Sequence, residues 1–194
     1  MSMPRIVLGS TSRYRAGLLR RIIDDFDQVA PDTDESPLPA EAPPARASRL
    51  AEAKARAAAA NLRDALVIGS DQVAALGRTV LHKPGSIEIA REQLRASSGK
   101  QVDFFTGLCV FDTRTGHGGS ALDHTRVVFR ELADAEIDRY LEREHPLDCA
   151  GSFKSETAGI TLFERIESTD PTALVGLPLI ALAALLRDAG FPLP

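Results

Sequence analysis

The chain has 194 residues and a formal net charge of −4, and 44% of its residues are hydrophobic. That length suits one large domain or two small lobes, and we expect a single domain over residues 1–194. The acidic balance argues against a protein that coats nucleic acid, although a local basic cluster would still bind a small anion. No apolar run approaches the roughly 20 residues that span a bilayer, and the N-terminus lacks the pattern of a secretory signal.

The chain has two cysteines, Cys109 and Cys149, and neither lies in a CxxC pair. This usage argues against a disulfide framework and against a structural zinc site. We expect both to be small core residues with reduced thiols, which fits a cytoplasmic protein.

Apolar periodicity and turn residues predict an alternation of strands and helices. In chain order we expect a strand (5–10), a helix behind a hydroxyl-rich turn (10–23), a Pro- and acid-rich loop (31–44), an Ala-rich helix (45–62), a strand (65–70), a hairpin (73–83), a helix with Ser86 as N-cap (86–97), two long antiparallel strands (101–112 and 120–132), a helix (134–144), a strand (159–168) and a closing helix (173–190). We therefore predict an α/β fold with a mixed, curved sheet, flanking helices and two lobes around a central cleft.

Asp71 is the most unusual residue of the predicted strands, because it stands between two apolar stretches in "LVIGSDQVAAL". A buried carboxylate without a partner costs at least several kcal/mol or takes up a proton. Asp71 therefore either caps a turn or is held at the end of a strand to do chemistry.

Basic residues that could neutralise it come from two other segments. The turn "GSTSRYR" puts Ser10, backbone N–H groups and Arg15 at the start of a helix, which is either an anion site or an ordinary N-cap. Lys54 shares a helix face with Leu50 and Ala58, so it either lays its stem along apolar surface or directs its ammonium into a cleft. By themselves, Lys83 and Glu35 are typical of surface charges, and Glu156 is typical of a helix cap.

A set of ordered motifs joins these residues. The chain resembles the Maf nucleotide pyrophosphatase family over nearly its whole length, from Ile6 to the last helix. The motif "GSDQV" and the segment from His145 to Leu179 are most similar to the YceF-type subgroup, which is associated with 7-methyl-GTP; other subgroups typically differ at the residue after the aspartate and at the position of Glu156. The motifs that carry the resemblance are "LGSTSRYRAGLL", "DES", "RLAEAKA", "VIGSDQV", "HKP", "FFTGL" and "FKSETAGI".

The resemblance implies a nucleoside triphosphate pyrophosphatase that hydrolyses the α–β phosphoanhydride of a modified nucleotide, most closely 7-methyl-GTP. It further implies a homodimer. The roles that it implies are a catalytic group of Asp71, Lys54 and Lys83, a substrate-binding group of Ser10, Tyr14, Arg15, Gln72 and Glu156, and a pair of metal ligands, Glu35 and Asp71. The metal would be Mg²⁺ or Mn²⁺, for which carboxylate oxygens are suitable ligands.

These assignments are chemically consistent. Asp71 can accept a proton from the attacking water, and cationic side chains can neutralise the developing charge. Glu156 can accept hydrogen bonds from N1–H and the amino group of guanine, and the Tyr14 ring can attract a methylated, cationic base. The chain departs from the family pattern at two positions, where Arg13 replaces a proline and Tyr14 replaces a tryptophan.

Two other interpretations remain. "DTDES" is similar to the nucleophile motif of haloacid-dehalogenase phosphatases, with Asp32 as the nucleophile, but that motif should directly follow an apolar strand and Pro31 intervenes. The family is also associated with inhibition of septum formation. The chain could thus be a nucleotide-binding regulator that acts through partners.

Overall fold

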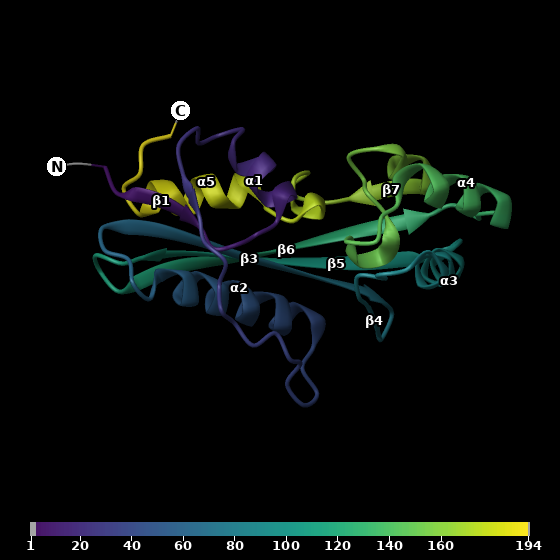
Figure 1. Cartoon of the computed structure of the whole chain (residues 1–194), viewed down its shortest axis with the longest axis horizontal. Coiled ribbons are helices and arrows are strands. Elements are labelled where there is room, and N and C mark those ends of the chain that lie inside the picture. The colour runs from purple at the N-terminus through teal and green to yellow at the C-terminus, as the bar shows by residue number, and fades with distance from the viewer. Residues whose placement is uncertain (1–2, 194) are drawn as a thin grey trace. The chain divides into compact units, whose positions relative to one another are not determined.

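A seven-stranded mixed sheet with five helices forms the framework of the protein in a computed structural model, which describes residues 3–193 (Figure 1). The strands follow the order β2-β1-β3-β5-β6-β7, and β4 pairs with β3. The strands are β1 (Arg5–Leu8), β2 (Asp27–Gln28), β3 (Ala65–Leu76), β4 (Thr79–Leu81), β5 (Gln101–Asp112), β6 (His117–Phe129) and β7 (Phe163–Glu167). The helices are α1 (Arg13–Leu19), α2 (Pro43–Ala59), α3 (Ile87–Ser97), α4 (Asp134–Glu144) and α5 (Leu179–Asp188).

The predicted α/β class with a mixed sheet and flanking helices is confirmed. β1 pairs in parallel with β2 and β3, whereas β3–β4 and β6–β7 are antiparallel. β5 and β6 are neighbours joined by a short turn, and a connection of that length allows only an antiparallel pair.

The chain divides into two compact units. The first unit contains Met1–Gln72, Thr106–Asp123 and Asp170–Pro194, and the second contains Val73–Phe105 and His124–Thr169. The assignment of 1–194 as one domain and the cleft between two lobes stay predictions.

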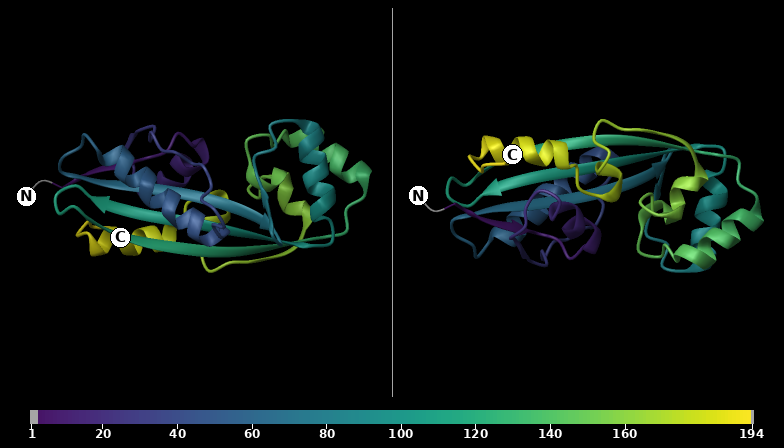
Figure 2. Two further views of the ribbon diagram at one scale, coloured as in Figure 1. Left: turned by 90° about the horizontal axis from the view of Figure 1, so that it is seen from below. Right: turned by 90° about the horizontal axis from the view of Figure 1, so that it is seen from above.

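Helices cover both faces of the sheet in the first unit. Figure 2 shows α2 over one face and α1 and α5 over the other. Successive side chains of β1 alternate between these layers, so that Ile6 and Leu8 pack in the cluster with α1 and α5, while Val7 packs against α2. The same alternation on β3 sends Leu66 and Ile68 to the first layer, and residues 65 and 67 to the second.

α2 can lie very close to the sheet because of a glycine on β3. A Cβ atom on Gly69 would lie 2.2 Å from the carbonyl oxygen of Ala51 and 2.5 Å from the amide nitrogen of Ala55. No real Cβ contact is that short, and both neighbouring atoms belong to the helix backbone. Small residues on both elements therefore set the spacing between α2 and β3, and with it the height of Lys54 above the strand.

We expect Gly69→Ala to destabilise the fold by about 3 kcal/mol, because the helix backbone must retreat from the added methyl group. The measurement is the free energy of unfolding from urea titration. Gly17→Ala is the matched control, since nothing lies within 4 Å of its added Cβ and alanine favours the helix by up to about 1 kcal/mol. Equal effects of the two substitutions would contradict the close approach of α2.

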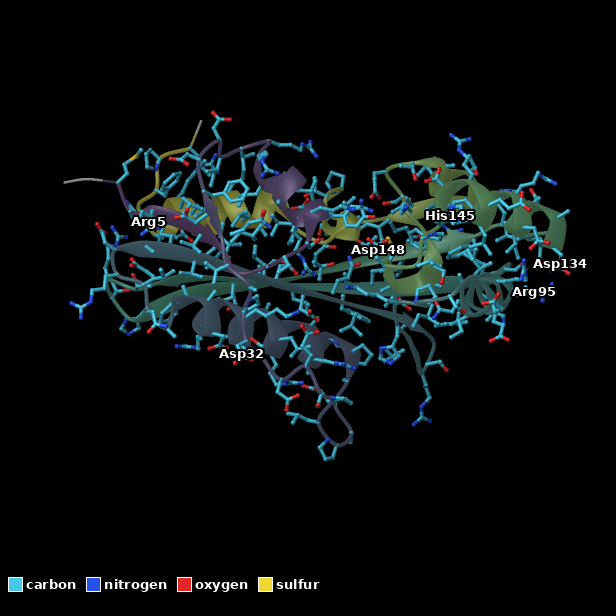
Figure 3. The ribbon with its side chains drawn as sticks, in the orientation of Figure 1. Arg5, Asp32, Arg95, Asp134, His145 and Asp148 are labelled. Carbon is cyan, nitrogen blue, oxygen red and sulfur yellow. The ribbon has the colours of Figure 1, made fainter. Side chains whose placement is uncertain are left out.

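An aromatic cluster forms the core of the second unit. Phe153 packs edge-to-face against Phe104, Phe129 and Phe163, with ring centroids 4.7–5.7 Å apart. α3 and α4 are joined by two ion pairs, one of which, Arg95–Asp134, has a nitrogen–oxygen distance of 2.7 Å (Figure 3).

Several predicted boundaries are wrong. The edge strand β2 was not predicted, because two exposed residues give no apolar pattern. β3 continues to Leu76, so Asp71 lies within the strand and not at its end. The closing helix begins only at Leu179, because Gly176 has a φ of +115° and Pro178 is the N-cap. Other elements also differ from the prediction in one or both ends, namely β1, α1, α2, β6 and β7.

The two cysteines differ in burial. Cys109 is buried against α2, as predicted, and burial raises the pKa of its thiol. Cys149 is half-buried in the second unit, so its assignment to the core is wrong. Among residues 3–193, no helix is both long enough and apolar enough to cross a membrane.

Candidate active site

The centre of the candidate site is an ion pair between β3 and α2. Asp71 follows residues 65, 67 and 69 in the alternation along β3, so its side chain points to the same face as Gly69, toward α2. There its Oδ1 accepts a hydrogen bond of 2.6 Å from Lys54 Nζ. Asp71 is 7% exposed and Lys54 is 6% exposed. The pairing explains how the strand tolerates a buried carboxylate in its middle.

Glu35 brings a second carboxylate to the same ammonium group. Its Oε1 lies 2.8 Å from Lys54 Nζ, and its side chain remains 57% exposed. Lys54 thus lies between two acidic side chains, one buried and one accessible. The Lys54 ammonium is therefore paired and not solvated, whereas its direction into a cleft stays a prediction.

The opposite face of β3 carries Ser70 and Gln72. Ser70 Oγ lies 2.8 Å from the carbonyl oxygen of Gly107 and 2.9 Å from that of Gly176. The Gly176 carbonyl also accepts a hydrogen bond of 2.9 Å from Arg15 Nε. One buried hydroxyl and one guanidinium are therefore tied to the same turn before α5.

Two nitrogens of the Arg15 guanidinium donate hydrogen bonds to different segments of the chain. Its Nη1 lies 3.3 Å from Ser10 Oγ, and Ser10 is 5% exposed. Burial lowers the pKa of the Arg15 guanidinium, and the charges of Asp71 and Glu35 oppose this shift. The cation is thus held near both carboxylates, which the interpretation as a solvated arginine does not explain.

The N-terminal turn is organised by its hydroxyl groups. Ser12 caps α1 and accepts a hydrogen bond from the backbone N–H of Arg15 at 3.4 Å. Ser10 Oγ accepts one from the backbone N–H of Ser12 at 3.2 Å, and Gln28 donates to the Ser10 carbonyl at 3.0 Å. The turn therefore has an N-cap at Ser12, while Ser10 orients Arg15.

Gln72 has a defined structural function. Its Nε2 donates to Thr106 Oγ1 at 3.0 Å and lies 3.0 and 3.1 Å from the carbonyls of Ala173 and Leu174. Three acceptors surround the nitrogen, so the amide orientation is fixed by its partners. If Gln72 contacts a base directly, it does so through the oxygen of its side-chain amide.

The segment from Asp170 to Gly176 supports Arg15 and Gln72, and sequence reasoning missed it. The buried Asp170 accepts hydrogen bonds from the backbone N–H groups of Thr172 and Ile180, which anchors the segment to the start of α5. Gly176 needs its glycine because its φ lies in the left-handed region. The "TDPT" and "VGLP" runs, rich in turn residues, were the available signal.

Tyr14, Lys83 and Glu156 are the remaining residues that were predicted for the site. Tyr14 is half-buried, and Arg13 places its guanidinium carbon 4.9 Å from the ring centroid and donates to the Tyr14 hydroxyl at 2.8 Å. Lys83 and Glu156 are exposed residues of the second unit. Their membership of the site stays a prediction, as do the catalytic and binding functions assigned to the others.

The donor set is suitable for a hard divalent cation. Among residues 3–193 there is no group of three or more His, Cys, Asp and Glu side chains that could hold a metal. However, Mg²⁺ is often held by one or two carboxylates together with phosphate oxygens and water. Glu35 and Asp71 meet at one ammonium and are the residues that would supply such carboxylates.

The surroundings of Asp32 do not match the dehalogenase-type motif. Asp32 is an exposed residue of the loop between β2 and α2, where Figure 3 labels it. The strand before it, β2, has only two residues, both exposed. A phosphorylated aspartate of that class should instead follow a buried strand directly.

Comparisons with known proteins assign this chain to a family. The family model described as Maf-like protein matches residues 5–189. This chain belongs to the Maf family. The family therefore covers both compact units, from β1 to the C-terminal end of α5, and includes every residue of the candidate site.

Three similar curated proteins are each named 7-methyl-GTP pyrophosphatase. The protein from Nitrosococcus oceani is 52% identical over 189 residues, which cover 97% of this chain and 95% of that protein. The protein from Burkholderia thailandensis is 54% identical, with 99% and 91% covered. The protein from Xanthomonas campestris pv. campestris strain 8004 is 55% identical, with 99% and 100% covered.

Proposed function

We propose that this chain is a nucleoside triphosphate pyrophosphatase that hydrolyses 7-methyl-GTP to 7-methyl-GMP and pyrophosphate. The observation that carries the proposal is the pair of carboxylates, Asp71 and Glu35, that shares the ammonium of Lys54 in a Maf family chain. The relatives at 52–55% identity support the substrate, because each is named for it.

The reaction breaks one phosphoanhydride bond. The oxygen of a water molecule forms a bond to the α-phosphorus, the bond from that phosphorus to the bridging oxygen breaks, and pyrophosphate leaves with the electron pair. Asp71 accepts the proton that the water loses. Glu35 and Asp71 would hold Mg²⁺, which neutralises phosphate charge when bound.

Cations of the chain stabilise the charge that develops on the phosphate oxygens. Lys54 is buried, and burial strengthens its attraction to an anion relative to the same charge in water. Arg15 is held by Ser10 and Gly176, so its guanidinium keeps one orientation without the cost of ordering a mobile side chain. Lys83 of the second unit supplies a further positive charge to the polyphosphate.

The base is selected by its charge and its hydrogen-bonding edge. Methylation at N7 makes guanine cationic, and the Tyr14 ring and the Glu156 carboxylate both favour a cation. Arg13 already lies against the Tyr14 ring and would have to move aside for the base. The homodimer and the cytoplasmic location belong to the same proposal.

A panel of nucleotides with pyrophosphate detection tests this function. We expect kcat/KM for 7-methyl-GTP in Mg²⁺ to exceed that for GTP, dTTP and UTP by at least about tenfold. The products should be equimolar 7-methyl-GMP and pyrophosphate. Release of orthophosphate, or a rate for dTTP or UTP equal to that for 7-methyl-GTP, would contradict the proposal.

A further inference from the structure

The loop that carries Glu35 has no helix or strand of its own. It runs from the end of β2 at Gln28 to the start of α2 at Pro43, and apart from a turn near Leu38 it lacks regular structure. Something other than a backbone ladder must therefore fix the position of the Glu35 carboxylate, which lies 2.8 Å from Lys54 Nζ.

Two arginines in the first part of α2 hold the two peptide groups that follow the Glu35 side chain. Arg46 Nη2 donates to the carbonyl oxygen of Glu35 at 3.0 Å. Arg49 Nη2 donates to the carbonyl oxygen of Ser36 at 3.1 Å. The two arginines are three residues apart, so they lie on one face of the helix and reach consecutive carbonyls.

Arg49 also closes the far end of the loop. It forms a two-pronged ion pair with Glu41, with Nε–Oε1 and Nη2–Oε2 distances of 2.5 and 2.8 Å. Glu41 Oε2 in turn accepts a hydrogen bond from the backbone N–H of Leu38 at 3.1 Å. The Arg49 guanidinium holds the pKa of Glu41 down at about 2, so this pair stays ionised at neutral pH.

The two arginines that hold the loop lie on the same helix as Lys54. Arg46, Arg49 and Lys54 all belong to α2, within about 12 Å along its axis. Arg46 Nε is buried, and it is one of two buried side-chain polar atoms of residues 3–193 without a hydrogen-bond partner. A buried donor without an acceptor is costly, and the hydrogen bond from Arg46 Nη2 to the loop offsets part of that cost.

We propose that Arg46 and Arg49 are positioning residues for Glu35: they hold the loop so that its carboxylate meets Lys54 and Asp71. This inference rests on the proposed function, because it assigns the two arginines to the same reaction. They act through the backbone of residues 35 and 36, and the Arg49–Glu41 pair keeps the loop closed behind that point.

The test compares Arg49→Gln and Arg46→Gln with Arg56→Gln in the full-length chain. Arg56 lies on the same helix and pairs with Glu52 on the surface, so it serves as a matched control. We expect each test variant to lower kcat with 7-methyl-GTP by about 100-fold, because a small misplacement of a group in the site has an effect of that size. The half-saturating Mg²⁺ concentration should rise by about tenfold.

Readouts independent of turnover separate positioning from general instability. In Arg49→Gln the amides of Ser36 and Leu38 should exchange hydrogen faster, while the amides of β3 keep their protection. Arg49→Lys should restore little, because an ammonium cannot form the two-pronged pair. In a Glu35→Gln background, Arg49→Gln should lower kcat no further.

The outcomes distinguish this inference from the proposed function. Unchanged kcat, Mg²⁺ dependence and loop exchange in both test variants would overturn the positioning function, as would a full additional loss of kcat in the Glu35→Gln background. If the wild-type chain hydrolyses no nucleotide, the proposed function fails. In that case faster exchange of the loop in Arg49→Gln alone still decides whether the arginines hold the loop.

Discussion

Asp71→Asn is expected to lower the rate of pyrophosphate release by about 10³-fold, because the amide cannot accept a proton from the attacking water. Asparagine has nearly the same shape, and its Oδ1 can still accept the hydrogen bond that Lys54 donates to Asp71. We therefore expect a folded protein that retains its affinity for nucleotide. Single-turnover assays with 7-methyl-GTP measure the rate, and titration of the variant with the same nucleotide measures the affinity.

Asp32→Asn is the matched control for this experiment. Asp32 is an exposed acid of the same unit, and we expect its substitution to leave the rate unchanged. A lost rate in Asp32→Asn, with a phosphorylated aspartate in the wild type, would instead support the dehalogenase-type reaction. A cellular effect on septum formation that persists in Asp71→Asn would show that such a function does not depend on catalysis.

Lys54→Met is the second substitution with a large expected effect, and it acts on both stability and activity. Methionine keeps the length and the apolar stem but removes the ammonium group that both the buried Asp71 carboxylate and Glu35 contact. Removing one partner of a buried pair costs about 3 kcal/mol or more, so the free energy of unfolding should fall by that amount. The rate should fall by at least about 10²-fold, because the charge on the phosphate loses a buried counter-charge.

The double variant Lys54→Met/Asp71→Asn shows whether the two groups act together. It carries neither buried charge, so we expect it to be more stable than Lys54→Met alone. Urea titrations of the wild type, the single variants and the double variant complete the cycle. If the two single losses simply add, Lys54 and Asp71 do not interact as the structure shows.

The periodicity of the sequence was enough to predict most of the fold. β5, α4 and the hairpin of β3 and β4 lie where the apolar pattern and the turn residues placed them, and Ser86 caps α3 as expected. These elements have long, regular patterns and clear ends. Short or exposed elements such as β2 escape such reasoning, because their formation depends on a neighbouring strand and not on their own residues.

The ends of the long elements were harder to predict. The change of polarity at Ser70 and Asp71 suggested that the strand ends there, yet β3 continues for five more residues beyond Asp71. The strand can continue because each polar side chain finds a partner on its own face: Ser70 contacts two carbonyls and Asp71 contacts Lys54. Such partners come from distant segments and are not visible in a local pattern.

In the candidate site, too, features that follow from a local sequence pattern could be predicted, and contacts between distant segments could not. The inward face of α2 predicted that Lys54 points inward, and the alternation of β3 is what makes Asp71 face it. The supporting contacts of Gly176, Asp170 and Arg49 could not be predicted, because each joins residues separated by irregular chain. Ser10, Arg15, Glu35, Lys54 and Asp71 all belong to the first unit, whereas Lys83 and Glu156 belong to the second.

The most direct test of this account is a crystal structure of the wild-type protein with Mg²⁺ and an α,β-methylene analogue of 7-methyl-GTP, which cannot be cleaved at the bond in question. The account predicts that the α-phosphate contacts Lys54 Nζ and lies next to the Asp71 carboxylate, with Glu35 on the same cation. A triphosphate bound with its α–β bridge more than about 10 Å from both Lys54 and Asp71 would contradict it, since charges that far apart are largely screened in water.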